Sequence, residues 1–295
     1  MSSPNLALAG VISKLSIRQW SGRKSDKSAS RDTAARHQAA ESMVRVSKDL
    51  VPKDALEPIR RFANEVRAFH YDHTICWSEG AQFLPARLTI PYSGAMQEFK
   101  LGFDSLVAGF CAQYAKLIEE APTLLGQLFQ QDDYPAPGRM RQHFSLDVDF
   151  EPVPEAGHFF AGLASNALDA FREDLEAKNE QRENAMRQDL WQRLHEPVLK
   201  MAEALRDPDR IFRDTLVTNI AGIAERIDDL NIFDDPSLAS LASSVRTTLA
   251  TLEPGLLRAS PSDRAAAASA ARELADSIAR KMSPFMSLVD VPLAA

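Results

Sequence analysis

The sequence predicts a mainly helical α+β protein, in which a small antiparallel sheet packs with helices and an extended helical, coiled-coil-like region follows. Two observations support this prediction: period-two alternation of apolar residues occurs only before residue 155, and helical periodicity dominates after it. Pro152 and Pro154 mark the change, because proline lacks the backbone N–H that a strand ladder needs. We therefore expect a compact α+β unit over residues 1–154 and a helical region over residues 155–295.

The first unit is expected to contain three short strands. Apolar and polar residues alternate over residues 15–20, 83–91 and 140–154, as they do in half-buried strands. The last of these stretches shows the alternation most clearly. We expect the three strands to form one antiparallel sheet.

Three helices are expected to cover this sheet. Residues 21–32 predict a polar turn, and the Ala-rich residues 33–50 predict a helix. Apolar residues spaced by three or four predict a second helix from Asp54 to about residue 69 and a long third helix over residues 92–120. The long helix is expected to lie in the core.

The second half shows only helical patterns. One pattern runs from about residue 158 past Trp191, and its centre, residues 176–184, is polar on every side between apolar flanks. A helix that is polar all round bridges two packed regions or projects from the body. Pro197 is expected to kink or interrupt this helix.

Three further helices are expected near the C-terminus. Their apolar spacing and start signals place them over residues 209–230, 236–252 and 262–282.

The charge of the chain is unevenly distributed. Its 34 Lys plus Arg and 41 Asp plus Glu give a formal net charge of -7. Residues 1–67 alone hold 13 basic and seven acidic residues, a balance of +6 that leaves -13 for the rest. The acidic total argues against a protein that coats nucleic acid with its whole surface, but the basic section leaves a local contact open.

The compartment can also be predicted. No apolar stretch approaches the length of a membrane span, and the N-terminus lacks the segments of a secretory signal. Cys76 and Cys111 are too few for a disulfide framework and fit a reducing compartment. We expect a cytoplasmic protein.

Cationic and aromatic side chains of the basic section form a candidate nucleic-acid site. Arginine and lysine contact phosphates, and an aromatic ring can stack on bases. The alternative is a solvated turn at a strand-to-helix junction. The candidate residues are Arg18, Trp20, Arg23, Lys24, Lys27, Arg31 and Arg36.

His70, His73 and Cys76 form the best candidate metal cluster. Histidine and cysteine are zinc ligands, and i, i+3 spacing places two imidazoles on one helical face. A fourth ligand is missing nearby, so the alternative is ordinary packing at a helix end. Glu155 and His158 have the Glu-x-x-His spacing of di-iron bundles, but the motif occurs once where such a site needs two.

No catalytic motif stands out. The segment Ser21-Gly22-Arg23-Lys24-Ser25 departs from a phosphate loop, because Arg23 separates the glycine from the lysine. Asp147 and Asp149 share one side of a predicted strand, but alternation makes this its solvated face. We predict no catalytic residues, no cofactor and no enzymatic activity.

Several Trp, Tyr, Gly and Pro positions of the first half follow a familiar order. They are Trp20–Lys24, Thr74–Trp77, Gly80–Pro85, Phe110–Tyr114, Leu125–Phe129, Tyr134-Pro135, Phe144 and Pro152–Pro154. This order resembles the bacterial and phage proteins of domain-of-unknown-function family thirty-one fifty. The resemblance implies an accessory protein of a phage or mobile element, in a bacterial cell or an infected host, often encoded near MoxR-type AAA+ ATPases. The family has no agreed activity and transfers no functional residue.

One leading hypothesis and two alternatives follow. The leading hypothesis is a non-enzymatic protein that acts through protein-protein interaction or self-assembly, as a homo-oligomer or on a partner such as an AAA+ ATPase. The first alternative is a nucleic-acid-binding accessory protein that uses the basic cluster. The second is a metal-dependent enzyme built on His70, His73 and Cys76.

Overall fold

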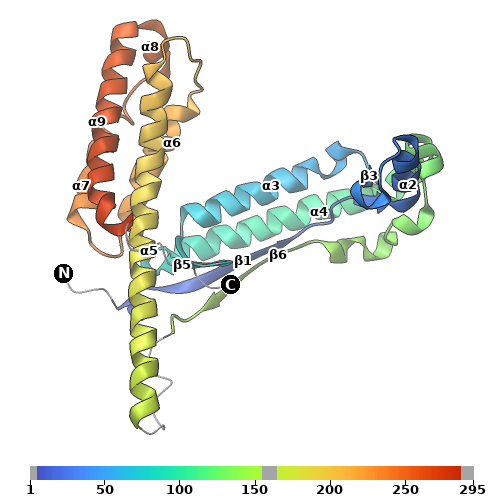
Figure 1. Cartoon of the computed structure of the whole chain (residues 1–295), viewed down its shortest axis with the longest axis horizontal. Coiled ribbons are helices and arrows are strands. Elements are labelled where there is room, and N and C mark those ends of the chain that lie inside the picture. The colour runs from blue at the N-terminus through green and yellow to red at the C-terminus, as the bar shows by residue number, and fades with distance from the viewer. Residues whose placement is uncertain (1–4, 155–164, 287–295) are drawn as a thin grey trace. The chain divides into compact units, whose positions relative to one another are not determined.

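The computed structural model describes residues 5–154 and 165–286 and shows a mainly helical α+β protein (Figure 1). The predicted fold class is therefore confirmed. The strands of the described residues form two antiparallel sheets rather than one. The larger sheet has the order β4-β5-β1-β6, with β4 at Ile75–Ser78, β5 at Ala81–Pro85, β1 at Gly10–Arg18 and β6 at Ser145–Glu151. The smaller sheet pairs β2 (Arg23–Asp26) with β3 (Val46–Asp49).

The chain divides into two compact units, each assembled from separate segments. Unit 1 comprises Met1–Lys14, His70–Tyr92 and Asp149–Ala295, and unit 2 comprises Leu15–Phe69 and Ser93–Val148. Each unit therefore combines segments that are close in space but distant along the chain. The expected division into residues 1–154 and 155–295 stays a prediction.

A tight hairpin organises the sheet in unit 1. Glu79 and Gly80 join β4 to β5, and Gly80 has φ +72°, a conformation that glycine adopts without a steric penalty. All five residues of β5 are buried. β5 also pairs with β1, in antiparallel register from Gly10 opposite Pro85 to Ser13 opposite Gln82.

The strand expected over residues 83–91 is wrong beyond Pro85. A single 3-10 turn follows at Ala86–Leu88, and the long helix α4 begins at Thr89. Leu88 is buried in this turn, whereas Ile90 lies exposed in the first turn of the helix. The alternation of Leu88 and Ile90 with their neighbours therefore resembles a strand pattern, although these residues form a 3-10 turn and the start of a helix.

Two long helices were predicted in the first half and are confirmed. They are α3 (Lys53–Asp72) and α4 (Thr89–Leu125). Within unit 2 the ring of Phe99 on α4 meets those of Phe62 and Phe69 on α3, with centroids 5.8 and 5.1 Å apart. Gly102 permits this close packing, because a Cβ there would lie 2.7 Å from the Phe62 ring.

Residues 21–50 differ from the prediction. The expected polar turn contains β2 and the start of α2 (Lys27–Arg36), and the expected Ala-rich helix ends at Arg36 instead of near residue 50. Asp26 caps α2 early by accepting a hydrogen bond from the Ala29 N–H at 3.0 Å. After a 3-10 turn at Glu41–Met43, the chain returns as β3 to pair with β2. Strand pairing therefore overrides the local helix propensity.

The helical second half is confirmed (Figure 1). Its helices are α5 (Ser165–Arg206), α6 (Thr215–Leu230), α7 (Pro236–Thr248), the short α8 (Pro254–Ala259) and α9 (Pro261–Met286). α5 packs along α9 and against α6, and α7 contacts α6 and α9. α5 continues through Pro197, where an interruption was expected. The start expected near residue 158 lies outside the described residues.

Arg264 on α9 closes the C-terminal end of α5. Its guanidinium donates hydrogen bonds to the carbonyls of Ala204 and Leu205, both at 3.1 Å, and of Arg210 at 2.8 Å. It also donates to the carbonyl of Asp207. The last carbonyls of a helix lack intrahelical partners, so one side chain satisfies them and fixes where α5 ends against α9.

None of the helices in residues 5–154 and 165–286 combines the length and the apolar character needed to cross a bilayer.

Small side chains on α9 set its distance from α5, which predicts the effect of a larger residue. Ala267, Ala271 and Ala275 are buried four residues apart. We expect Ala271→Leu to lower the free energy of unfolding by about 1–3 kcal/mol, because extra methylenes overpack this interface. Ala266→Leu, at an exposed position of α9, is the matched control and should change stability by less than about 0.5 kcal/mol. Equal effects of both substitutions in urea denaturation would contradict close packing here.

Candidate functional site

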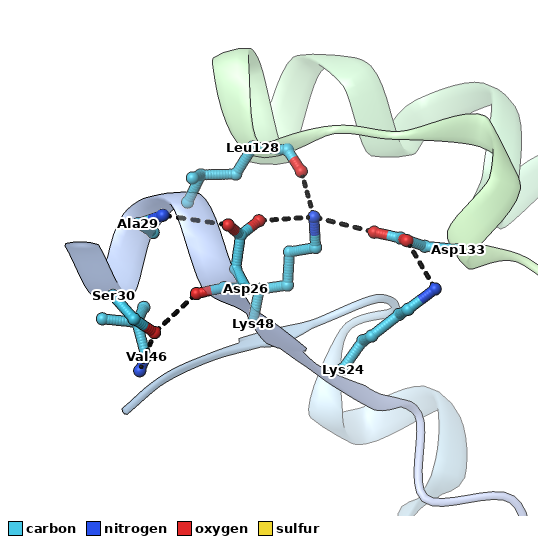
Figure 2. A network of polar contacts seen from close by, with 8 residues as sticks. All are labelled: Lys24, Asp26, Ala29, Ser30, Val46, Lys48, Leu128 and Asp133. Carbon is cyan, nitrogen blue, oxygen red and sulfur yellow. Dashed lines mark hydrogen bonds and ion pairs between the residues drawn. The ribbon is translucent and has the colours of Figure 1, made fainter. Parts of the chain in front are cut away.

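A buried network of charges in unit 2 centres on Lys48 (Figure 2). Its Nζ lies 2.8 Å from Asp26 Oδ2 and 2.7 Å from Asp133 Oδ2, and it donates a hydrogen bond to the Leu128 carbonyl at 2.5 Å. Lys24 pairs with the other oxygen of Asp133 at 2.8 Å. The Lys48 ammonium, whose side chain is only 3% exposed, is thereby in contact with two carboxylates and one carbonyl.

The network stabilises the charged forms of its members. The Ala29 N–H and then Lys48 lower the pKa of Asp26. Burial opposes ionisation of Asp133, but hydrogen bonds from Lys24 and Lys48 outweigh it and lower the pKa of that carboxyl. Burial likewise opposes the charge on Lys48, and the two carboxylates raise its pKa instead. Two lysines and two aspartates therefore form a neutral group.

The elements that meet at this network explain its role. Lys48 lies on β3, Asp26 joins β2 to α2, and Leu128 and Asp133 belong to the turns after α4. Ser30 strengthens the junction, because its hydroxyl donates to the Asp26 carbonyl at 2.6 Å and accepts from the Val46 N–H at 2.9 Å. All charged groups face one another, so the arrangement suits structural anchoring rather than proton transfer.

The predicted nucleic-acid residues occupy different environments. Trp20 is half-buried, and its ring packs against Phe110 and Tyr114, with centroids 6.1 and 5.6 Å away. Its indole is thereby part of the packing of unit 2.

Three of the predicted cations have acidic partners. Arg23 pairs with Asp49 at 2.8 Å, Lys24 belongs to the buried network, and Arg31 lies 3.7 Å from Glu41. Arg18, Lys27 and Arg36 are exposed and make no ion pair with any described residue. The structure thus divides the predicted cluster, and nucleic-acid binding by the whole set stays a prediction.

His70, His73 and Cys76 do not assemble a metal site. Within residues 5–154 and 165–286, no group of three or more His, Cys, Asp or Glu residues could hold a metal ion. Cys76 is exposed on β4, and its backbone N–H donates to Asp189 Oδ2 at 2.9 Å. The Glu155 and His158 motif lies outside the described residues.

His70 instead belongs to a buried polar contact in unit 1. Its Nδ1 shares a hydrogen bond of 2.6 Å with the Tyr92 hydroxyl, which lies 3.5 Å from the Ser13 hydroxyl. Burial lowers the pKa of His70 to about 4 and raises the pKa of Tyr92 to about 12. The neutral imidazole is therefore the form that this site holds.

The two aspartates of β6 lie on a solvated face. Asp147 and Asp149 are both exposed, and Asp147 pairs with Lys100 of α4 at 3.0 Å. This arrangement agrees with the solvated-face interpretation rather than with paired catalytic carboxylates.

A groove between α5 and α6 is the main candidate interaction surface of unit 1. Two adjoining hollows of about 260 and 320 Å³ share Asp72, Pro197, Ile223 and Arg226, and we call them together the α5–α6 groove. The remaining lining residues are Tyr71, Arg193, Glu196, Lys200, Thr215, Leu216, Asn219, Ile227 and Leu230. Those from α6 recur at helical spacing along the groove.

The groove combines an apolar floor with a paired, charged rim. Arg226 lies 3.3 Å from Asp72, and Lys200 lies 3.4 Å from Glu196. Arg193 binds both oxygens of Asp189 at 3.0 and 2.8 Å and donates to the Tyr71 carbonyl at 2.5 Å. The last bond fixes the end of α3, whose Tyr71 is 51% exposed.

Neither the Lys48 network nor the groove as a whole was predicted from the sequence. Lys48 lay in an expected helix, and nothing in its local pattern signals burial. Its partner Asp26 is 22 residues away, and Leu128 is 80 residues away. Only the apolar periodicity of residues 209–230 pointed to one wall of the groove.

The Lys48 network should be essential for the stability of unit 2. Lys48→Met leaves Asp26 and Asp133 buried without their shared cation, so we expect the free energy of unfolding to fall by roughly 3 kcal/mol. Lys116→Met removes an equally charged but exposed side chain and should have almost no effect. If urea denaturation gives the two variants the same stability, the network does not anchor the unit.

His70 should make stability depend on pH. Its folded pKa of about 4 lies below its unfolded value, so its contribution is complete above the unfolded pKa and is lost as the pH falls toward 4. With an unfolded pKa of about 6.5, the loss between pH 7 and pH 5 is about 2 kcal/mol. His70→Gln should remove this part of the pH dependence, whereas His37→Gln, at an exposed position, should not. Identical pH profiles of unfolding for both variants would show that His70 is not responsible.

No family model, curated protein or solved structure matches this chain. The resemblance to family thirty-one fifty stays a prediction, and the functional conclusions below depend on the contacts within the chain itself.

Proposed function

We propose that this chain is a non-enzymatic protein that acts through protein-protein interaction, and that the α5–α6 groove is the surface through which it self-associates. The observation that supports this function is the apolar floor of the groove between charged side chains that are already paired. A role in a phage or mobile element, and docking on an AAA+ ATPase, are the expectations that the family resemblance adds.

The floor of the groove suits a protein surface. Leu216, Ile223 and Ile227 on α6 recur at spacings of seven and four residues, and Pro197 on α5 faces the same hollows. An amphipathic helix buries apolar side chains of the same spacing in such a groove. Ile227 is already buried, so the apolar area that a partner would remove from water, at roughly 25 cal/mol per Å², belongs to Leu216, Ile223 and Pro197.

The charges of the rim suit a second copy of the chain. Arg193, Lys200 and Arg226 alternate with the acidic groups that pair with them. A rim with both signs can exchange ion pairs with an identical surface across a twofold axis, because each cation then meets the partner copy's carboxylate. A strongly acidic or strongly basic partner would find no matching excess of charge.

The exposed part of α5 agrees with an interaction role. Ala177, Lys178, Glu180 and Gln181 are exposed, within the stretch predicted to be polar on every side. The helix extends past α6–α9 in this direction (Figure 1).

Self-association can be tested by light scattering of the full chain over a range of concentrations. We expect a mass above the 32.6 kDa of the monomer that increases with concentration. Ile223→Glu places a charge in the floor and should weaken self-association at least tenfold, or by about 1.4 kcal/mol or more. Thr218→Glu, at an exposed position of α6 outside the groove, is the matched control and should leave it unchanged.

Two results would reject the proposal. One is a wild-type mass of 32.6 kDa at every concentration. The other is equal weakening by Ile223→Glu and Thr218→Glu, which would place the interface elsewhere. Circular dichroism checks that both variants remain folded.

A further inference from the structure

The pairing of β2 with β3 separates two sets of charged side chains in unit 2. Lys24 lies opposite Lys48, and Asp26 lies opposite Val46, on the face that contributes to the buried network. Because side chains alternate along a strand, residues 23, 25, 47 and 49 lie on the opposite face. We call this opposite face, with the flanking Lys27 and Arg45, the outer ribbon face.

The outer ribbon face presents hydroxyls between charged ends. Ser25 lies opposite Ser47, and both are exposed. At one end Arg23 and Asp49 form a cross-strand ion pair of 2.8 Å, and Lys53 lies 3.9 Å from the same carboxylate, so the cations at this end share an acidic partner. The other end follows the last pair, Asp26 with Val46, and there Lys27 begins α2 and Arg45 precedes β3.

Lys27 and Arg45 are the cations that the fold leaves available at this end. Both are exposed, and neither forms an ion pair with any residue that the structure describes. The buried network cannot neutralise them, because its two lysines and two aspartates balance one another. The positive charge of the outer ribbon face therefore has no internal partner.

Arg31 adds a third cation one turn further along α2. It lies four residues after Lys27, on the same side of the helix. Its guanidinium lies 3.7 Å from the Glu41 carboxylate, and the two side chains are 68% and 72% exposed. Such an exposed, salt-screened pair contributes little to stability, so Arg31 can exchange Glu41 for a phosphate at little cost.

We propose that the outer ribbon face binds the phosphate backbone of nucleic acid, with Lys27 and Arg45 as the central contacts, Arg31 beside them, and Ser25 and Ser47 as hydrogen-bond donors. Arginine, lysine and serine side chains are among the groups that contact the phosphate backbone in nucleic-acid complexes. Trp20 has no part in this surface, because its ring packs on Phe110 and Tyr114. Binding is therefore independent of sequence.

The test measures fluorescence anisotropy of a labelled single-stranded DNA of about 20 nucleotides and mixed sequence with the full chain, between about 50 and 200 mM salt. Wild-type protein should bind, and its affinity should fall steeply as salt rises. Lys27→Ala/Arg45→Ala should raise Kd about tenfold and reduce the slope of log K against log salt by about 1.4, because two phosphate contacts are lost.

A matched control separates this site from net charge. Arg61→Ala/Lys116→Ala also removes one arginine and one lysine from unit 2, at side chains 76% and 77% exposed. It should bind like the wild type. A second variant, Ser47→Glu, adds a negative charge to the outer ribbon face without removing a cation and should also raise Kd.

The proposal is overturned by absence of wild-type binding at about 50 mM salt, or by equal losses in the double variant and its control. It is also overturned if Ser47→Glu, folded by circular dichroism, binds as tightly as the wild type. These outcomes are independent of the α5–α6 groove, because Ile223→Glu should bind the DNA unchanged at concentrations where the chain is monomeric.

Discussion

The ammonium group of Lys48 is the constraint on which the organisation of unit 2 depends. A buried cation is costly unless every donor has a partner, and here two carboxylates and one carbonyl meet that need. Its partners come from two segments that are distant from β3 along the chain: Asp26 before α2, and Leu128 and Asp133 in the turns after α4. Satisfying one charged group therefore fixes the position of the ribbon, the start of α2 and the turns after α4 relative to one another.

Unit 1 relies on a different principle, the repeated use of α5 as a packing surface. Trp191, Leu194 and Val198 are buried on it, and the buried face of α9 combines three alanines with Ile278 and Met282. Polar anchors then fix its C-terminal end and its register. Arg264 closes its C-terminus, and Asp189 accepts a hydrogen bond from the backbone of β4. Apolar packing supplies stability along the helix, and these bonds determine its position.

Elements that depend on apolar packing within one segment were predictable from the sequence, and elements that depend on distant polar partners were not. α3, α4 and the helices of the second half were predictable, because their apolar faces repeat within the segment itself. Residues 21–50 were not, because β2 and β3 form only by pairing with each other across an intervening helix. The candidate sites share this limitation. Lys27 could be identified as a cation, but the register that places it beside Arg45 is a property of the folded ribbon.

Charge pairing determines which basic residues are available to a ligand. Unit 2 contains 16 Lys or Arg and 14 Asp or Glu, so it accounts for +2 of the net -7 and leaves -9 for unit 1. Lys24, Lys48 and Arg23 are paired with acidic residues of the same unit, so they are not available to a ligand. Among the exposed cations without an ion pair to a described residue, Lys27 and Arg45 flank one end of the ribbon, whereas Arg18 ends β1 and Arg36 ends α2. A surface of few cations can therefore attract a polyanion locally, while the acidic remainder of the chain disfavours contact elsewhere.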